Sequence, residues 1–169
     1  MKFLGRNLNL SRFQADEHYQ SALAAYTARD FKTARTEIQA SIDLLPEHAE
    51  YHAALGYFRL EERDLPLAQD AFERALDLHP YEMLANYCLG LLAYREKNWK
   101  RAASFFTNAL AAQPKRAETQ FYMAMIHHRL GRNAEAIDWM QSAAAGFVRA
   151  GDQRERNCRA WISEFERLL

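Results

Sequence analysis

The chain contains 169 residues, of which 22 are basic and 22 acidic, so its formal net charge is zero. With 49% apolar residues, the composition is that of a folded protein and excludes an intrinsically disordered chain. The balanced charge argues against nucleic-acid binding, which needs a basic excess or stripe. No apolar run is long enough to span a bilayer, and residues 1–10 lack the apolar core of a signal peptide. We therefore expect a cytoplasmic protein that does not insert into membranes.

The N-terminal residues 1–10 form a broken apolar segment, because Gly5 and two asparagines interrupt it. Its apolar side chains are Phe3, Leu4, Leu8 and Leu10. We expect either an N-terminal tail or a segment that docks on an apolar surface of its own or a neighbouring molecule. Ser11 follows and is predicted to be the N-cap of a first helix over residues 12–28.

Helical patterns and turn residues divide the following chain into pairs of helices. Pro46 ends a second helix over residues 31–45, because proline cannot continue a helix and restricts the residue before it. Gly131 is predicted to be a C-cap. The remaining predicted pairs are residues 47–62 with 65–78, 81–96 with 99–112, and 115–130 with 133–150.

The helix pairs repeat at a constant interval of about 34 residues, which is typical of a solenoid of stacked repeats. Leu55-Gly56, Ala68, Phe72 and Pro80 return as Leu89-Gly90, Ala102, Phe106 and Pro114. Small residues in one phase allow two helices to approach closely, and one large side chain per pair fills the remaining gap. Burial of each such side chain contributes about 1.5–3 kcal/mol.

Residues 151–169 are predicted to form a C-terminal capping helix, with Gly151-Asp152 as a stop and a new N-cap. Its apolar residues recur at helical spacing and its charged residues occupy the other face. The apolar set is Cys158, Trp161, Ile162, Phe165 and Leu168. Cys88 and Cys158 lie far apart within helical patterns, so buried thiols in a reducing compartment are expected rather than a disulfide.

The repeated residues resemble the tetratricopeptide repeat, a unit of about 34 residues whose signature is W-x2-L-G-x2-Y…A-x3-F…P. Departures are His52 and Asn86 at the tryptophan position, Arg59 and Ala93 at the tyrosine position, and Ser21-Ala22 in place of Leu-Gly. The resemblance implies an all-α solenoid, a right-handed superhelix of helix-turn-helix units ended by the capping helix. Within residues 11–150 the four repeats cover about residues 15–46, 49–80, 83–114 and 117–150.

The resemblance also implies that the first helices of the repeats line a concave groove that binds a peptide or helix of a partner protein. The expected groove residues are Tyr19, Leu23, Tyr26, Tyr57, Leu60, Tyr87, Leu91, Tyr94, Phe121, Met125 and His128, with Arg95 and Arg129 near the lip. Leu23, Tyr57, Leu91 and Met125 hold one equivalent position in the four repeats. They are apolar, whereas the family often carries asparagine at this position. An exposed apolar stripe marks a binding surface; the alternative is ordinary packing between repeats.

Other sites are disfavoured by the sequence. Some family members bind a C-terminal carboxylate through charged hydrogen bonds. The matching positions here are Tyr19, Leu23, Ala54, Leu84 and Cys88, and none of these side chains can donate such a bond. His48 and His52 are four residues apart but have no third metal ligand, and no phosphate loop or nucleophile motif occurs. We expect no enzyme activity, metal or cofactor.

The sequence therefore predicts a non-enzymatic protein–protein interaction module, such as an adaptor, assembly factor or chaperone. Its expected ligand is an apolar or aromatic peptide or helix, with tyrosine hydroxyls satisfying the backbone groups of that segment. The alternative is a structural scaffold that self-associates as a homo-oligomer, with its N-terminal segment in its own or a neighbour's groove.

Overall fold

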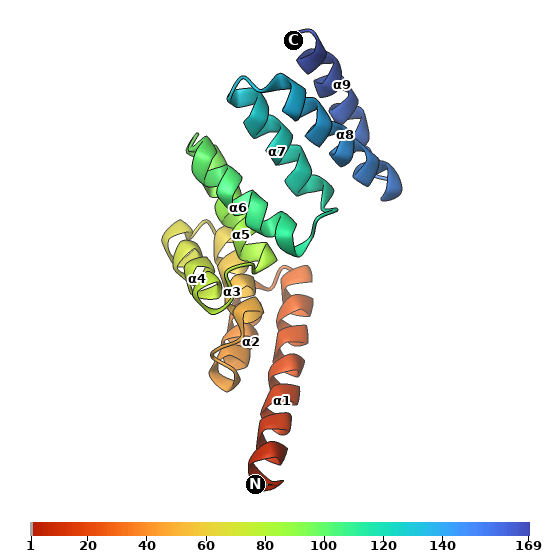
Figure 1. The fold of residues 1–169 in the computed structure, drawn as a ribbon. Helices are drawn as coiled ribbons and strands as arrows, with labels where there is room; N and C mark the ends of the chain where they lie inside the picture. Colours follow the sequence, from red (N-terminus) through yellow and green to blue (C-terminus); the bar gives the residue numbers. More distant parts are fainter. Residues whose placement is uncertain (1) are drawn as a thin grey trace. The chain divides into compact units, whose positions relative to one another are not determined.

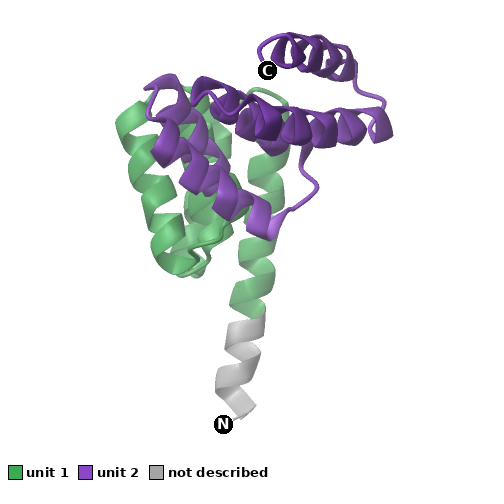
Figure 2. Ribbon diagram, turned by 45° about the horizontal axis from the view of Figure 1, so that its top comes forward, with its two compact units in different colours: residues 1–85 green, residues 86–169 purple. Residues whose placement is uncertain are grey.

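The computed structural model describes the backbone of residues 2–169 and the side chains of residues 10–169, and the described backbone forms helices without strands (Figure 1). The chain folds as two compact units, residues 1–85 and 86–169 (Figure 2). The helices are α1 (Lys2–Thr27), α2 (Phe31–Leu44), α3 (Ala49–Glu61), α4 (Leu65–Leu78), α5 (Met83–Arg95), α6 (Trp99–Ala112), α7 (Ala117–Arg129), α8 (Asn133–Arg149) and α9 (Arg154–Glu166).

Helices α2 to α9 begin and end within three residues of their predicted bounds, and consecutive helices pack as α1 with α2, α3 with α4, and α7 with α8. The first helix differs, because α1 begins at Lys2 rather than Arg12. Ser11 therefore lies inside α1, and its prediction as an N-cap is wrong. Residues 2–10 contain no proline, so nothing in their backbone forbids the helix from continuing. The expected docking of Phe3, Leu4 and Leu8 concerns side chains outside the described residues.

The turn within each helix pair uses one residue in the left-handed region, at the same position of every repeat. Arg29, Arg63 and Lys97 have φ values of 62°, 64° and 60°, and Gly131 has 74°. The glycine is the C-cap that the sequence predicts, since glycine alone adopts this conformation without a steric cost.

The residue after each of the first three left-handed positions caps the next helix with its side chain. The N-caps are Asp30, Asp64 and Asn98, whose side chains accept from the backbone N–H three residues later at 3.1, 3.4 and 3.2 Å. In the fourth pair this position is Arg132, which makes no side-chain capping bond.

Close approach of paired helices explains the periodic small residues. A Cβ atom at Gly56 would lie 2.7 Å from the Phe72 ring, and one at Gly90 would lie 2.7 Å from the Phe106 ring. Both phenylalanine side chains are fully buried. Because a methyl group cannot fit at that distance, the glycines allow the rings to fill the space between the helices of a pair.

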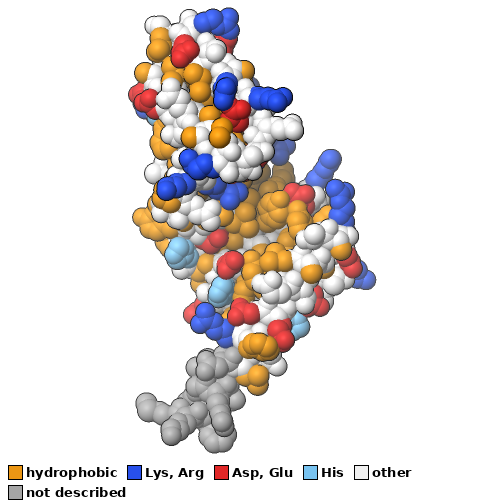
Figure 3. Space-filling view, turned by 90° about the vertical axis from the view of Figure 1, so that its right-hand side faces the viewer, with side chains coloured by type: hydrophobic (Ala, Val, Ile, Leu, Met, Phe, Trp, Pro, Cys, Tyr) orange, Lys and Arg blue, Asp and Glu red, His pale blue; other side chains and the backbone are white. Residues whose placement is uncertain are grey.

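Each unit has its own core. In residues 1–85, one core cluster contains Ala22, Ile38 and Phe58, with the rings of Tyr19 and Tyr57 partly buried against it. In residues 86–169, Cys158 and Phe165 of α9 are fully buried in a cluster with residues of α7 and α8. Charged residues of α9 such as Arg156 and Arg159 are exposed on its other face. On the face shown in Figure 3, acidic and basic side chains are interspersed with hydrophobic ones.

Candidate functional site

The first candidate surface lies in the N-terminal unit, on helices α1 and α3. All five residues predicted to line the groove here are partly exposed: Tyr19, Leu23, Tyr26, Tyr57 and Leu60. The ring of Tyr26 stacks on Phe58 with centroids 5.0 Å apart, and it meets Tyr57 at 5.6 Å. These contacts fix the rings between neighbouring repeats, so the surface is apolar and preformed.

The tyrosine hydroxyls at one end of this surface are engaged within the protein. Tyr19 donates to Glu50 at 3.0 Å, and Tyr51 donates to Asp16 at 2.7 Å. Burial and the adjacent carboxylate raise the pKa of Tyr19, and the pKa of Tyr51 is raised in the same way. Both hydroxyls therefore keep their protons and donate hydrogen bonds to carboxylates of the chain. That tyrosine hydroxyls satisfy the backbone groups of a bound segment stays a prediction.

The second candidate surface lies in the C-terminal unit, where Tyr87, Leu91 and Tyr94 of α5 are partly exposed. Tyr94 meets the ring of Tyr122 edge-on, with centroids 5.3 Å apart and an interplanar angle of 71°. Tyr122 in turn stacks on the buried Phe106 at 5.4 Å. Tyr87, Leu91 and Tyr94 therefore pack against the core of the unit while part of each side chain remains exposed.

The capping helix changes the predicted role of α7. Met125 is 5% exposed and belongs to the core cluster that contains Cys158 and Phe165 of α9. The expectation that Met125 lines an open groove is therefore wrong, because it is buried among the residues that pack with α9. His128 remains partly exposed, but its ring stacks on Phe165 at 4.7 Å and its Nδ1 is 2.9 Å from Asn133 Oδ1.

The two predicted lip arginines, Arg95 and Arg129, are exposed at the last residues of α5 and α7. A positive charge at a helix C-terminus interacts favourably with the helix dipole. Their position has this local explanation, and a role in binding stays a prediction.

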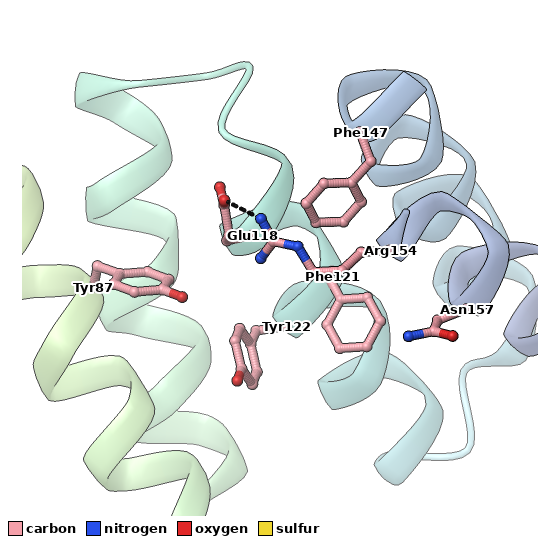
Figure 4. A pocket seen from close by; sticks show the side chains of 7 residues that line it. All are labelled: Tyr87, Glu118, Phe121, Tyr122, Phe147, Arg154 and Asn157. Carbon is pink, nitrogen blue, oxygen red and sulfur yellow. Dashed lines mark hydrogen bonds and ion pairs between the residues drawn. The ribbon is translucent and has the colours of Figure 1, made fainter. Parts of the chain in front are cut away.

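A pocket of about 150 Å³ lies in the C-terminal unit, where the predicted residues Tyr87 and Phe121 meet α8 and α9 (Figure 4). Phe121 and Tyr122 are nearly perpendicular, at 88° with centroids 5.7 Å apart, and Tyr87 meets Tyr122 at 68° and 6.3 Å. Burial raises the pKa of Tyr87 to about 12, so its hydroxyl stays protonated. The lining residues are Tyr87, Glu118, Phe121, Tyr122, Phe147, Arg154 and Asn157.

Charged groups at this pocket are paired. Arg154 donates to Glu118 Oε1 at 2.9 Å and to Asp152 Oδ2 at 2.6 Å, and its guanidinium lies 4.4 Å from the centre of the Phe147 ring. Burial raises the pKa of Glu118, but hydrogen bonds and the charges of Arg154 and Arg116 outweigh it, so this pKa lies below its ordinary value. The Arg116 guanidinium is 4.7 Å from the centre of the Tyr87 ring.

Five lining residues of the pocket were not predicted: Glu118, Tyr122, Phe147, Arg154 and Asn157. Three of them belong to α8 and α9, whose packing against α7 is a tertiary feature. One signal was available, since Cys158 lies one repeat length after Ala124 and therefore continues the phase of the small residues. By this spacing, α9 occupies the position that the first helix of a fifth repeat would have.

The histidines singled out by spacing have local contacts. His52 Nε2 lies 2.8 Å from the carbonyl oxygen of Pro46, and the His48 ring stacks on Tyr51 at 4.1 Å. Within the described part of the chain, no three His, Cys, Asp or Glu side chains gather at metal-binding distance. None of the described helices combines the length and apolar character needed to cross a bilayer. Both cysteines are buried and lie outside any disulfide, as the sequence predicts.

Paired helices, periodic small residues and repeated turns define a helical-repeat protein. A sequence profile described as tetratricopeptide repeat matches residues 19–83, 59–117 and 87–153. The chain belongs to the tetratricopeptide repeat family, which confirms the predicted all-α solenoid class. Membership in this family supports a general role as a protein–protein interaction scaffold.

Solved structures agree on the fold. The chain is similar to pilF of Pseudomonas aeruginosa, with TM-score 0.69 and 15% identity over 92% of this chain and 78% of that one. It is similar to a tetratricopeptide repeat protein of Parabacteroides merdae, with TM-score 0.68 and 15% identity over 90% of this chain and 60% of that one. It is also similar to MamA of Desulfovibrio magneticus, with TM-score 0.63 and 16% identity over 92% of this chain and 94% of that one. A comparison with curated proteins found no match.

Proposed function

We propose that the protein is a non-enzymatic interaction module, an adaptor, assembly factor or chaperone, that binds an apolar or aromatic segment of a partner along the first helices of its repeats. The observation that carries the proposal is the partial exposure of Tyr57 and Leu91, which hold equivalent positions in two repeats. Each is packed against a core cluster, so it is held in place without being fully buried. Within each unit, partly exposed apolar side chains that lie together on one surface are typical of a site for another molecule.

The residues around these two positions support the same role. Tyr26 and Tyr94 add aromatic area that is ordered by neighbouring rings. Aromatic side chains give large contact areas at a small cost in conformational entropy. The two buried thiols, which form no disulfide, are consistent with a reducing compartment, and we propose a cytoplasmic location.

The proposal is tested by photo-crosslinking in the native cell. A benzoylphenylalanine residue introduced at Leu91 should crosslink to one partner protein, and mass spectrometry should locate the contact in an apolar or aromatic segment. The matched control carries the same residue at Asp70, which is exposed on the second helix of its pair. Equal crosslinking from Leu91 and Asp70 would contradict the proposal.

A second candidate function, self-association, is favoured by one observation on α1. Leu10 is 57% exposed and Phe13 is 61% exposed, and both precede the part of α1 that pairs with the shorter α2. We propose as the alternative that this end of α1 contacts a second copy of the chain. Light scattering should then give a dimer or larger species that Leu10→Ser with Phe13→Ser converts to a monomer, while Gln14→Ser does not. A wild-type monomer at all concentrations rules this alternative out.

A further inference from the structure

The pocket formed by α5, α7, α8 and α9 suggests which kind of side chain anchors the partner. We infer that it takes one uncharged aromatic side chain, of the phenylalanine type, from the bound segment. This inference deepens the proposed function and rests on it, because the ring would belong to the partner that lies along α5 and α7. It concerns the residues Tyr87, Phe121, Tyr122 and Phe147, which supply four rings to one cavity.

The size of the pocket matches one six-membered ring. Its volume is about 150 Å³. An apolar cavity of about this volume in another protein binds benzene. A pocket of this size therefore has room for the ring of one phenylalanine side chain.

The arrangement of the rings favours an aromatic occupant over an aliphatic one. Phe121 and Tyr122 stand at 88° to each other, and Tyr87 and Tyr122 at 68°. An inserted ring can therefore stack on one of them while it meets the edge of another, which are the two preferred geometries of aromatic pairs. An aliphatic side chain of equal volume gains no such interaction.

The charges at the pocket favour a neutral occupant. Arg154 and Glu118 both line it, and they are joined at 2.9 Å, with Asp152 bound to the same guanidinium at 2.6 Å. A cation in the pocket would approach Arg154, and an anion would approach Glu118, whose pKa lies below its ordinary value. A charged occupant would therefore find only groups of opposite sign that are already paired with each other.

Two polar side chains, Arg154 and Asn157, also line the pocket. The bonds that Arg154 makes to Asp152 and Glu118 use its Nε and Nη2, which leaves Nη1 out of these bonds. Asn157 adds a side-chain amide, which can both donate and accept. These groups complement the carbonyl and N–H that flank any peptide side chain.

The test uses four capped amino acids as probes: the N-acetyl amides of phenylalanine, leucine, arginine and aspartate. Nuclear magnetic resonance titration of the full chain should show saturable shifts of the Asn157 side-chain amide and of the Phe121 and Tyr122 backbone amides with the phenylalanine probe. Its dissociation constant should be about threefold to tenfold lower than that of the leucine probe, the range that an aromatic pair supplies. The arginine and aspartate probes should not saturate these signals.

A matched pair of variants locates the site. Asn157→Trp fills the pocket from an exposed position and should abolish the shifts, whereas Arg156→Trp, exposed on the same helix but outside the lining, should retain them. A phenylalanine probe that binds no tighter than leucine, or that binds equally to Asn157→Trp, would overturn the inference. Because the probes need no partner, this failure is distinct from failure of Leu91 crosslinking, which would overturn the proposed function.

Discussion

The Arg154 guanidinium donates a 2.9 Å hydrogen bond to the Glu118 carboxylate and so joins the first residue of α9 to the first turn of α7. Asp152, just before α9, accepts from the same guanidinium and from the Arg154 backbone N–H at 2.8 Å. One arginine thus fixes the start of the capping helix and one wall of the aromatic pocket.

This ion pair makes the stability of the C-terminal unit dependent on pH. The pKa of Asp152 is lowered by its hydrogen bonds from Arg154, and that of Glu118 also lies below its ordinary value of 4.5. Carboxylates with a lowered folded-state pKa stabilise the fold above their unfolded pKa, and this contribution is lost as the pH falls through the folded pKa. Arg154→Gln should therefore lower the melting temperature at about pH 7 and lower it less at about pH 3, which lies below the ordinary pKa values of both carboxyl groups.

The control for this prediction is Arg156→Gln, which removes a neighbouring exposed arginine of the same helix. It should change the melting temperature little at either pH, because exposed charges contribute little. A deficit of Arg154→Gln that is the same at both pH values would show that the side chain acts by packing on Phe147 alone.

The glycine in the middle of α5 should not tolerate even a methyl group. At Gly90 the new Cβ would lie 2.7 Å from the buried Phe106 ring. Gly90→Ala should lower the free energy of unfolding by about 1–3 kcal/mol, as overpacked cores do. Urea denaturation followed by circular dichroism measures it.

A double-mutant cycle separates this clash from the intrinsic helix preference of alanine. Phe106→Leu removes the ring, so Gly90→Ala in that background should cost less than it does alone. An unchanged cost in the Phe106→Leu background would contradict the close contact.

Substitutions at two equivalent positions of the repeated left-handed turn should change the free energy of unfolding in opposite directions. Lys97 has φ 60° and Gly131 has φ 74°, and a Cβ at Gly131 would meet nothing within 4 Å. Gly131→Ala should therefore lower the free energy of unfolding by about 1 kcal/mol through backbone strain alone, and Lys97→Gly should raise it by about 0.5–1 kcal/mol. Changes of the same sign in the two variants, measured by chemical denaturation, would contradict the strain argument.

The buried Cys158 thiol should be unreactive in the folded protein. Burial raises its pKa to about 11, so only about one molecule in ten thousand carries a thiolate at neutral pH. Ellman's reagent should label neither Cys158 nor the equally buried Cys88 until denaturant is added. Rapid labelling of Cys158 in the native protein would show that α9 detaches from α7 and α8.

The helix pairs, their turns and their small residues were predictable because they depend on spacings within one repeat. Gly90 and Phe106 belong to the same helix pair and keep the separation that Gly56 and Phe72 have in the preceding repeat. Gly131 is a C-cap by its residue type alone. The start of α1 was not predictable in this way, because Gly5 weakens a helix without forbidding it.

The candidate site was only half predictable, because it depends on where α9 packs. Tyr87 and Phe121 follow from the repeat phase, whereas Arg154 and Asn157 reach the pocket only after α9 has docked. Met125, which its repeat position alone predicts to be exposed, is likewise buried in the cluster that contains Cys158 and Phe165 of α9. Spacing along the chain assigns a residue to a helix face, but it does not show which neighbouring helix covers that face.

The most direct test of the account is a calorimetric titration with the partner segment that Leu91 crosslinks in the cell. Leu91→Arg with Tyr57→Ala should weaken binding by at least about thirtyfold while circular dichroism stays helical, because one substitution puts a charge in place of an apolar contact on α5 and the other removes an aromatic contact on α3. The control Asp70→Arg, on a second helix, should bind as the wild type does. Wild-type affinity in the Leu91→Arg and Tyr57→Ala protein would contradict the claim that the first helices form the binding surface.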